Sequence, residues 1–176
     1  MKTRALFLDR DGVINIDYGY VYLKKDFVFQ AGIFDLCRQA IKSNFKIFIV
    51  TNQSGIGRGY YSNEEFVKIT NWMLEVFSIN NILIDEVYFC SHRPEDQCAC
   101  RKPETGMIDL AVEKYNIELK TSVIIGDSQS DLDLGLRLNI GCIVGLGARL
   151  KPNNKRVKYY SDIMCLDFDE LFKFDV

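Results

Sequence analysis

Short apolar segments and stretches with helical spacing alternate through most of this chain. The apolar segments are separated by intervals that are too long for hairpins, and helical patterns fill the intervals. This alternation is typical of a parallel sheet that helices cover on both faces. We therefore predict an α/β fold with a central parallel sheet, whose expected strands are residues 4–9, 46–51, 86–90, 122–126 and 141–145.

Three helices are expected between these strands. Apolar residues in 33–41, 66–77 and 108–115 recur at the spacing of one helix face. Ser62, followed three residues later by Glu65, forms a capping-box pattern at the start of the second helix. With 176 residues, the chain is most simply one domain, residues 1–176, which is large enough to bury a core without disulfides.

Charge and targeting signals exclude several classes of protein. The formal net charge is −2, so nothing indicates a broad surface for nucleic acid or membrane. The first apolar segment is too short for a signal peptide, and no stretch approaches the roughly 18 apolar residues of a membrane span. We expect a cytoplasmic protein that binds neither nucleic acid nor membrane. The basic patch at residues 151–158 is expected to be a solvated loop.

Asp9 and Asp11 follow the first apolar segment, and Gly12 comes directly after them. Two carboxylates held close together repel each other, which raises the pKa of one of them unless a cation neutralises the pair. A hard metal ion would do so, and one carboxylate could then serve in covalent catalysis. Asp and Gly are also ordinary turn residues, so the motif taken alone leaves a solvated turn open.

Two more of the expected strands end in polar loops. Thr51-Asn52-Gln53-Ser54-Gly55 follows the second strand and offers hydroxyl, amide and backbone groups to a phosphate, and Gly126-Asp127 follows the fourth. Ligands of open α/β sheets bind outside the carboxyl ends of the strands, so we expect these loops to meet Asp9 and Asp11 in one pocket. Lys102 would supply the positive charge that an anionic substrate needs. Each segment by itself is also compatible with an ordinary turn.

Three of the six cysteines and the only histidine lie within eleven residues, in the spacing C-x-H-x5-C-x-C. The four residues are Cys90, His92, Cys98 and Cys100. Four nitrogen and sulfur ligands make a closed tetrahedral site, which is typical of structural Zn²⁺. We predict a zinc site that stiffens this loop and holds Arg101 and Lys102 over the pocket. A plain cysteine-rich loop is the alternative.

Taken in order, these motifs resemble the four motifs of the haloacid dehalogenase (HAD) superfamily of phosphatases. The matching residues are Asp9-x-Asp11-Gly12, Thr51-Asn52-Gln53, Lys102 and Gly126-Asp127. The resemblance covers residues 4–150 and implies a HAD-like Rossmannoid three-layer fold without a cap domain. Context and this resemblance also predict a helix over residues 131–138, although their strict alternation would by itself indicate a strand.

The resemblance implies a mechanism. Asp9 would attack the phosphorus and form an aspartyl-phosphate, and Asp11 would act as general acid and then as general base. Mg²⁺ would be held by the Asp9 carboxylate, the Asp11 backbone carbonyl and Asp127, while Thr51 and Lys102 would bind the transferring phosphoryl group. The loop at residues 15–28 and the zinc loop would form the pocket walls. The expected contacts to the rest of the substrate are Asn52, Gln53, Ser54, Arg58 and Arg101.

The cysteine–histidine loop narrows the resemblance to the zinc-containing branch of heptose bisphosphate and histidinol-phosphate phosphatases. The segments at residues 9–15 and 18–21 resemble the heptose enzymes, so we expect a monomer that removes the C7 phosphate of D-glycero-D-manno-heptose 1,7-bisphosphate, for nucleotide-heptose and lipopolysaccharide core synthesis. The short spacer between His92 and Cys98 is closer to histidinol-phosphate phosphatases, and Ser128 stands where heptose enzymes commonly carry lysine.

Histidinol-phosphate phosphatase is therefore the alternative function. A polynucleotide 3′-phosphatase shares the Asp-x-Asp-Gly and Thr-Asn-Gln motifs, but the acidic balance of the chain counts against it. A non-catalytic, zinc-stabilised binding domain is the remote alternative, disfavoured because all the motif side chains are intact.

Overall fold

The structure is a computed structural model that describes residues 2–147, 150 and 153–174. Its strands are β1 (Arg4–Leu8), β2 (Phe45–Asn52), β3 (Glu86–Cys90), β4 (Val123–Gly126), β5 (Cys142–Leu146) and β6 (Val157–Tyr160). Its helices are α1 (Ile33–Lys42), α2 (Ser54–Gly57), α3 (Asn63–Ile79), α4 (Gly106–Tyr115), α5 (Gln129–Arg137) and α6 (Phe168–Leu171). None of these helices is both long and apolar enough to cross a bilayer.

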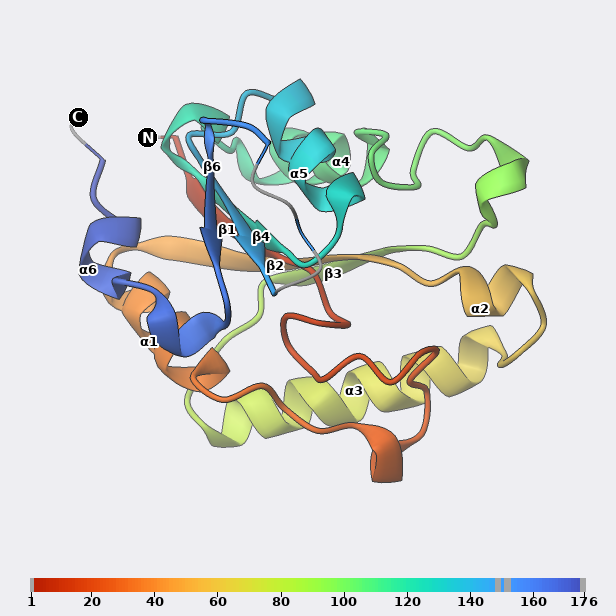
Figure 1. Cartoon of the computed structure of the whole chain (residues 1–176). Coiled ribbons are helices and arrows are strands. Elements are labelled where there is room, and N and C mark those ends of the chain that lie inside the picture. The colour runs from red at the N-terminus through yellow and green to blue at the C-terminus, as the bar shows by residue number, and fades with distance from the viewer. Residues whose placement is uncertain (1, 148–149, 151–152, 175–176) are drawn as a thin grey trace.

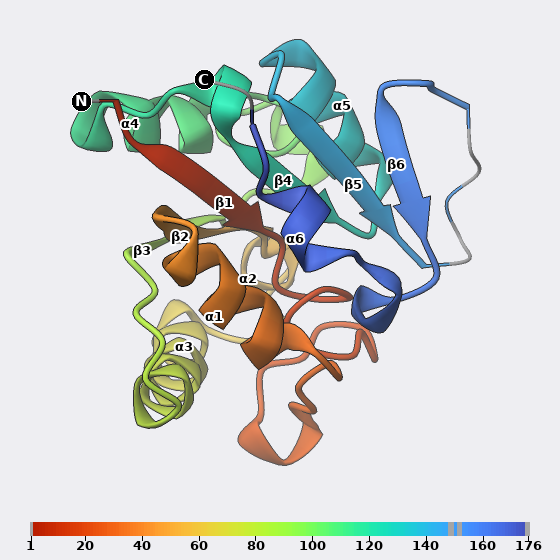
Figure 2. The ribbon, with the colours of Figure 1, turned by 90° about the vertical axis from the view of Figure 1, so that its left-hand side faces the viewer.

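The six strands form one sheet in the order β3-β2-β1-β4-β5-β6, and every neighbouring pair is parallel. Helices α1, α3 and α6 lie on one face of the sheet, and α4 and α5 lie on the other (Figure 1; Figure 2). The predicted α/β fold with a central parallel sheet is confirmed. The predicted strands agree with β1 to β5 to within about one residue at each end.

The central strands are apolar on both faces because helices cover both. In β1, Leu6 and Leu8 pack into the cluster that contains the buried side chains of α1 and α3. Ala5 and Phe7 point the other way, into the cluster that contains those of α4 and α5. None of the four has any exposed surface, and complete burial of a side chain the size of leucine or phenylalanine contributes about 1.5–3 kcal/mol.

The three predicted helices correspond to α1, α3 and α4. The capping box at α3 is present: the Ser62 hydroxyl accepts from the Glu65 backbone N–H, and the Glu65 carboxylate accepts from that of Ser62. The alternating segment at residues 131–138 is helical as far as Arg137, as context and resemblance predict. The alternation of leucine with polar residues is misleading here because the buried face of α5 includes a charged residue, Asp131. The apolar residues alone therefore do not show the helical spacing of that face.

β6 is absent from the sequence-based prediction. The interpretation of residues 151–158 as a solvated loop is wrong at its end, since Val157 and Lys158 belong to this strand. Residues 153–156 have no helix or strand, and residues 151–152 lie outside the described part of the chain. A four-residue edge strand with one buried side chain carries little periodic signal, and the neighbouring lysines and arginine hide it further.

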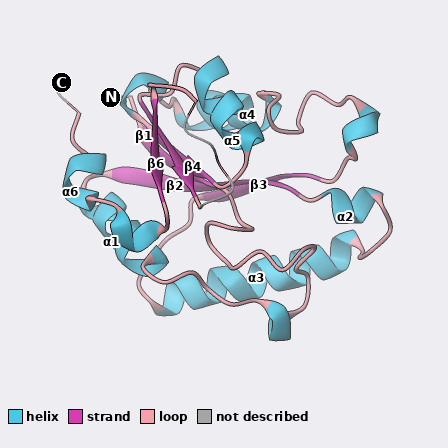
Figure 3. Cartoon of the chain, viewed as in Figure 1, coloured by secondary structure: helices cyan, strands magenta, loops and turns pink. Residues whose placement is uncertain are grey.

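Long connections gather at the carboxyl edge of the sheet (Figure 3). Residues 9–32 join β1 to α1, residues 91–105 join β3 to α4, and only Asp127 and Ser128 separate β4 from α5. The polar motifs lie in or next to these connections, or at the end of β2. The fold therefore places them at one edge, where the strand order brings β2, β1 and β4 side by side.

Candidate active site

Three neighbouring strands end in the predicted polar residues. Thr51 lies at the end of β2, Asp9 follows β1, and Asp127 follows β4. The backbone N–H of Asp9 donates to the Ile125 carbonyl at 3.0 Å, which ties the ends of β1 and β4 together. Carboxylate oxygens of Asp9, Asp127 and Asp131 all lie within 4.8 Å of one another. The structure thus brings Asp9 and Asp127 together, as the strand-end motifs predict.

Lys102 reaches this cluster from the connection that follows β3, and its side chain is 1% exposed. Its ammonium lies 3.0 Å from Asp9 Oδ1 and 2.6 Å from Asp131 Oδ1, and it donates to the Val50 carbonyl at 2.7 Å. These three acceptors match the three hydrogens of the ammonium. Burial lowers the pKa of Lys102, but the charges of Asp131 and Asp9 outweigh burial and hold that pKa above its ordinary value, so the group stays cationic.

Asp131 is a site residue that is missing from the predicted set. It is 2% exposed, and both carboxylate oxygens are engaged. Oδ1 faces Lys102, while Oδ2 accepts from the backbone N–H and the hydroxyl of Ser128, which forms the capping box of α5. A Cβ on Gly126 would come within 2.1 Å of Asp131 Cβ, so only glycine fits there. The spacing of Ser128 and Asp131 was the sequence signal that could have found it.

Asp9 and Asp127 are the carboxylates best placed to hold a cation. Burial, followed by the charge of Asp131, raises the pKa of Asp9 to about 8, against the opposing effect of Lys102. Burial, with the charges of Asp131 and Asp17, raises the pKa of Asp127 to about 6. Carboxylates crowded in this way are stabilised in the ionised form by a hard divalent ion. The donor set therefore fits a metal such as Mg²⁺.

Gly12 makes the close approach of Asp127 possible. A Cβ at this position would lie 2.0 Å from Asp127 Oδ2, and the residue has a φ of +86°, a backbone conformation that favours glycine. Gly12 is therefore required because the Asp127 carboxylate occupies the space that a side chain at this position would need.

The Asp11 carboxylate is held by three side chains. Arg10 Nη2 lies 2.7 Å from each of its oxygens, Asn15 Nδ2 donates to Oδ1 at 3.0 Å, and Gln53 Nε2 donates to Oδ2 at 2.9 Å. Arg10 is 1% exposed and lies 5.7 Å from the centre of the Phe66 ring. Arg10 and Asn15 are also missing from the predicted set, because their burial depends on the fold and has no local signal.

Asn52 and Gln53, which are predicted to contact substrate, have their amides bonded to protein groups. Asn52 Nδ2 donates to the Lys102 carbonyl at 3.1 Å, and the Lys102 backbone N–H donates to Asn52 Oδ1 at 3.0 Å. This pair of hydrogen bonds ties the Lys102 backbone to the end of β2. Gln53 is 2% exposed and also donates to the Thr51 hydroxyl at 2.8 Å. Both residues position neighbouring groups here, and their contacts with substrate stay predictions.

The cysteine–histidine residues form a second cluster. Cys90 ends β3, and the other three residues lie in the connection that follows it. The ligand atoms stand close together: Cys100 Sγ is 3.2 Å from Cys90 Sγ and 3.3 Å from His92 Nδ1, and Cys98 Sγ is 3.5 Å from the other two sulfurs. These separations are at or slightly below the ligand–ligand distances of a tetrahedral zinc site, which are about 3.5–3.8 Å. The cluster could hold a metal ion.

Comparison with known proteins places the chain in a family. A family model described as polynucleotide kinase 3 phosphatase matches residues 11–161. A D-glycero-alpha-D-manno-heptose-1,7-bisphosphate 7-phosphatase of Campylobacter jejuni is 49% identical over 144 residues, which cover 82% of this chain and 83% of the relative. The chain belongs to the heptose-1,7-bisphosphate 7-phosphatase family. A D-glycero-beta-D-manno-heptose-1,7-bisphosphate 7-phosphatase of Helicobacter pylori is 43% identical, with 96% of this chain and 95% of the relative covered.

A solved structure shows the same fold. A D,D-heptose 1,7-bisphosphate phosphatase from B. bronchiseptica, complexed with magnesium and phosphate, matches with a TM-score of 0.83 at 24% identity, over 92% of this chain and 94% of that one. The predicted HAD-like fold is therefore confirmed. Membership of this phosphatase family makes the chain a phosphoric monoester hydrolase, and it favours the heptose substrate over histidinol phosphate.

The cavities of this phosphatase differ in part from the predicted pocket. A cavity of about 610 Å³ is lined by Asp9, Asp11, Asp17 and Asp127, together with the start of α5, Leu150 and Asn153. The metal-ligand loop lines a separate cavity of about 570 Å³ that contains Arg101. The first predicted wall, residues 15–28, is confirmed at Asp17. The second predicted wall, the cysteine–histidine loop, does not line this cavity. Its place is taken by the connections after β4 and β5, because β4 neighbours β1 in the sheet and β5 neighbours β4.

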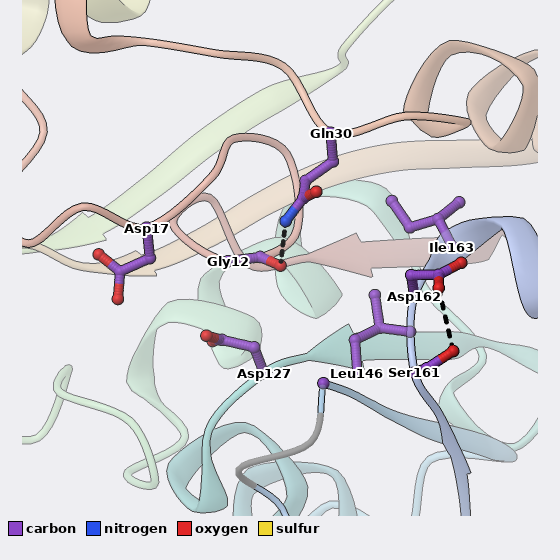
Figure 4. A pocket seen from close by; sticks show the side chains of 9 residues that line it. Gly12, Asp17, Gln30, Asp127, Leu146, Ser161, Asp162 and Ile163 are labelled. Atoms are coloured by element: carbon purple, nitrogen blue, oxygen red, sulfur yellow. Dashed lines mark hydrogen bonds between the residues drawn. The ribbon is translucent and has the colours of Figure 1, made fainter.

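A third cavity, of about 360 Å³, adjoins the first at Asp17 and Asp127. Figure 4 shows these two carboxylates on one side of it and Ser161 and Asp162 on the other. Gln30 closes its upper part by donating to the Gly12 carbonyl at 3.3 Å. The acidic lining continues the negative charge of the metal-binding carboxylates outward from the site.

The remaining predicted substrate contacts, Ser54, Arg58 and Arg101, do not line the cavity over Asp9. Ser54 begins α2, and the Arg58 guanidinium follows that helix, 3.9 Å from the Glu95 carboxylate. Arg101 donates to the His92 carbonyl at 3.3 Å from within the metal-ligand loop. The last two are cationic side chains in the connections after β2 and β3, and the roles of all three stay predictions.

Proposed function

We propose that this protein is a Mg²⁺-dependent phosphatase that hydrolyses the C7 phosphate of D-glycero-D-manno-heptose 1,7-bisphosphate. The observation that carries the proposal is the arrangement around Asp9. The buried Lys102 forms an ion pair with it, and Asp127 lies close enough to bind the same metal ion. Asp11 comes two residues later in the chain. The names of the Campylobacter and Helicobacter relatives support this substrate, and the magnesium and phosphate bound to the B. bronchiseptica enzyme support the metal.

In the proposed reaction Asp9 is the nucleophile. Its backbone is tied to β4, and its Oδ1 accepts from the Arg10 backbone N–H at 2.7 Å and faces Lys102, so that Oδ2 is left for attack on phosphorus. Attack forms an aspartyl-phosphate and expels the sugar oxygen. Asp9 and Asp127, with the Asp11 carbonyl, would hold Mg²⁺, which supplies positive charge to the phosphoryl oxygens and favours the ionised form of Asp9.

Asp11 transfers the protons in this proposal. It would give a proton to the leaving sugar oxygen and then accept one from the water that hydrolyses the aspartyl-phosphate. The hydrogen bonds from Asn15 and Gln53 set the orientation of its carboxylate. Lys102 and Thr51 would bind the phosphoryl group, with Lys102 balancing the charge that develops on it. Asn52, Gln53, Ser54, Arg58 and Arg101 stay candidates for contacts with the rest of the sugar phosphate.

We also propose that Cys90, His92, Cys98 and Cys100 hold a structural Zn²⁺. Three thiolates and one imidazole complete a tetrahedral shell and leave no position for substrate. Lys102 comes two residues after the last ligand, so the ion would fix the segment that delivers the catalytic charge. Metal analysis should find about one equivalent of zinc, and Cys98→Ser should lower both metal content and Tm. Full metal content and an unchanged Tm in this variant would contradict the zinc site.

The decisive assay measures phosphate release from both anomers of the heptose bisphosphate and from histidinol phosphate. We expect one phosphate per sugar, from C7, only with Mg²⁺, and a strong preference over histidinol phosphate. Asp9→Asn should abolish release, while Asp35→Asn, at an exposed position of α1, should leave it unchanged. Equal turnover of histidinol phosphate, or release by the Asp9 variant, would contradict the proposal. Monomeric state, cytoplasmic location and a role in lipopolysaccharide core synthesis stay predictions.

A further inference from the structure

A chain of hydrogen bonds extends from Asp11 into the protein. Gln53 Nε2 donates to Asp11 Oδ2 at 2.9 Å, and on the other end of the same amide the Tyr61 hydroxyl donates to Gln53 Oε1 at 2.6 Å. Gln53 is 2% exposed and Tyr61 is 5% exposed, so water does not compete for these groups. The Gln53 amide therefore has protein partners at both its nitrogen and its oxygen.

The orientation of this amide matters for Asp11. A glutamine side chain can turn by 180° and exchange its carbonyl for its NH₂ group, because the two have the same shape. In the turned orientation a carbonyl oxygen would face the Asp11 carboxylate, and a supporting donor would become a repelling acceptor. When Asp11 carries a proton, as a general acid must, it can donate to that carbonyl, so Asp11 by itself does not determine which way the amide points.

Tyr61 favours the observed orientation, because its hydroxyl donates to Gln53 Oε1 and makes no other hydrogen bond to the described residues. In the turned orientation the phenol oxygen could accept from the NH₂ group, but the buried hydroxyl hydrogen would be left without an acceptor. Burial raises the pKa of Tyr61 to about 12, which keeps the hydroxyl protonated. The ring is held in place by Tyr22, which stacks on it at a centroid distance of 5.1 Å and an angle of 10°. Gly55 leaves the space for it, since a Cβ there would lie 2.2 Å from the Tyr61 ring.

We propose that Tyr61 is a positioning residue for proton transfer by Asp11, and that it acts by fixing the orientation of the Gln53 amide. The inference rests on the phosphatase mechanism proposed above. Tyr61 touches neither substrate nor reacting atoms, so its loss should affect the step that needs a proton from Asp11 and leave binding unchanged.

The first experiment compares Tyr61→Phe with Tyr22→Phe in the full-length enzyme. Tyr61→Phe removes one oxygen from the chain of hydrogen bonds, whereas Tyr22→Phe removes a hydroxyl for which the described residues offer no hydrogen-bond partner. For the heptose bisphosphate we expect Tyr61→Phe to lower kcat about fivefold, the equivalent of the roughly 1 kcal/mol of a neutral hydrogen bond, with KM within twofold of wild type. Tyr22→Phe should match wild type.

The second readout separates positioning from general damage. p-Nitrophenyl phosphate has a leaving group that needs no proton, so the rate of its first burst of nitrophenolate should be the same in Tyr61→Phe and wild type. A double-mutant cycle with Gln53→Met should show no further loss of kcat when the Tyr61 hydroxyl is removed in the Gln53→Met background. An equal fall with both substrates, an effect that persists in that background, or no fall at all would overturn the inference.

These outcomes are distinct from failure of the proposed function. If wild type releases no phosphate from the heptose bisphosphate, the proposed function fails. If wild type is active and the Tyr61→Phe effects are absent or unselective, only the role of Tyr61 fails.

Discussion

Replacing the nucleophile should stabilise the metal-free protein while it abolishes activity. Burial, followed by the charge of Asp131, raises the pKa of Asp9 from its ordinary 3.8 to about 8. Between these two pH values the fold retains a proton that the unfolded chain releases, so this carboxyl lowers stability as the pH rises. At pH 7 the cost is on the order of 4 kcal/mol, and at pH 4 it is below about 1 kcal/mol. Asp9→Asn removes this cost.

The assay is thermal and urea denaturation of wild type and Asp9→Asn in the presence of EDTA, at pH 4 and at pH 7.5. Recovery of even half of the cost, about 2 kcal/mol, would raise Tm by roughly 4–8 °C at pH 7.5 and by much less at pH 4. Asp11→Asn is the control and should lower Tm, because it removes the carboxylate that pairs with the buried Arg10 guanidinium. An Asp9→Asn protein that melts at or below the wild-type Tm at pH 7.5 would refute the reasoning.

Three more predictions follow from the same contacts. Lys102→Met leaves the buried Asp131 carboxylate without its cation and should cost about 3–5 kcal/mol, measured by urea denaturation. Gly12→Ala places a Cβ against Asp127 at a positive φ and should cost more than about 1 kcal/mol and weaken Mg²⁺ binding, measured by calorimetric titration. Protons compete with metal for Asp9 and Asp127, whose pKa values are raised to about 8 and 6, so Mg²⁺ should raise Tm more at pH 8.5 than at pH 6. A Mg²⁺ effect on Tm that is equal at the two pH values would contradict this.

The strand-end residues could be predicted because a parallel sheet orders them. Once β1, β2 and β4 are recognised as apolar segments, their carboxyl ends meet at one edge, and Asp9, Thr51 and Asp127 follow from chain position alone. The cysteine–histidine cluster was predictable for a similar reason, since its spacing is local and its donor chemistry is unusual.

The supporting residues could not be predicted in the same way. Arg10, Asn15 and Asp131 look like ordinary surface residues along the chain, and they are buried only because distant segments close over them. Asp131 sits on an alternating segment where its charge suggests exposure, yet it faces Lys102 from across the sheet edge. Gln53 was recognised as a site residue, but the direction of its amide depends on Tyr61, which packs against it only in the fold.

The cluster of three carboxylates around one ammonium has a consequence for the order of events in a catalytic cycle. When all are ionised, Asp9, Asp127, Asp131 and Lys102 together carry two negative charges, which one divalent cation neutralises. If a phosphate dianion arrives before the cation has bound, the negative cluster repels it. If it arrives after the cation, it meets a cluster whose charge has been neutralised. Binding should therefore be compulsorily ordered, cation first and sugar phosphate second, and release should follow the reverse order.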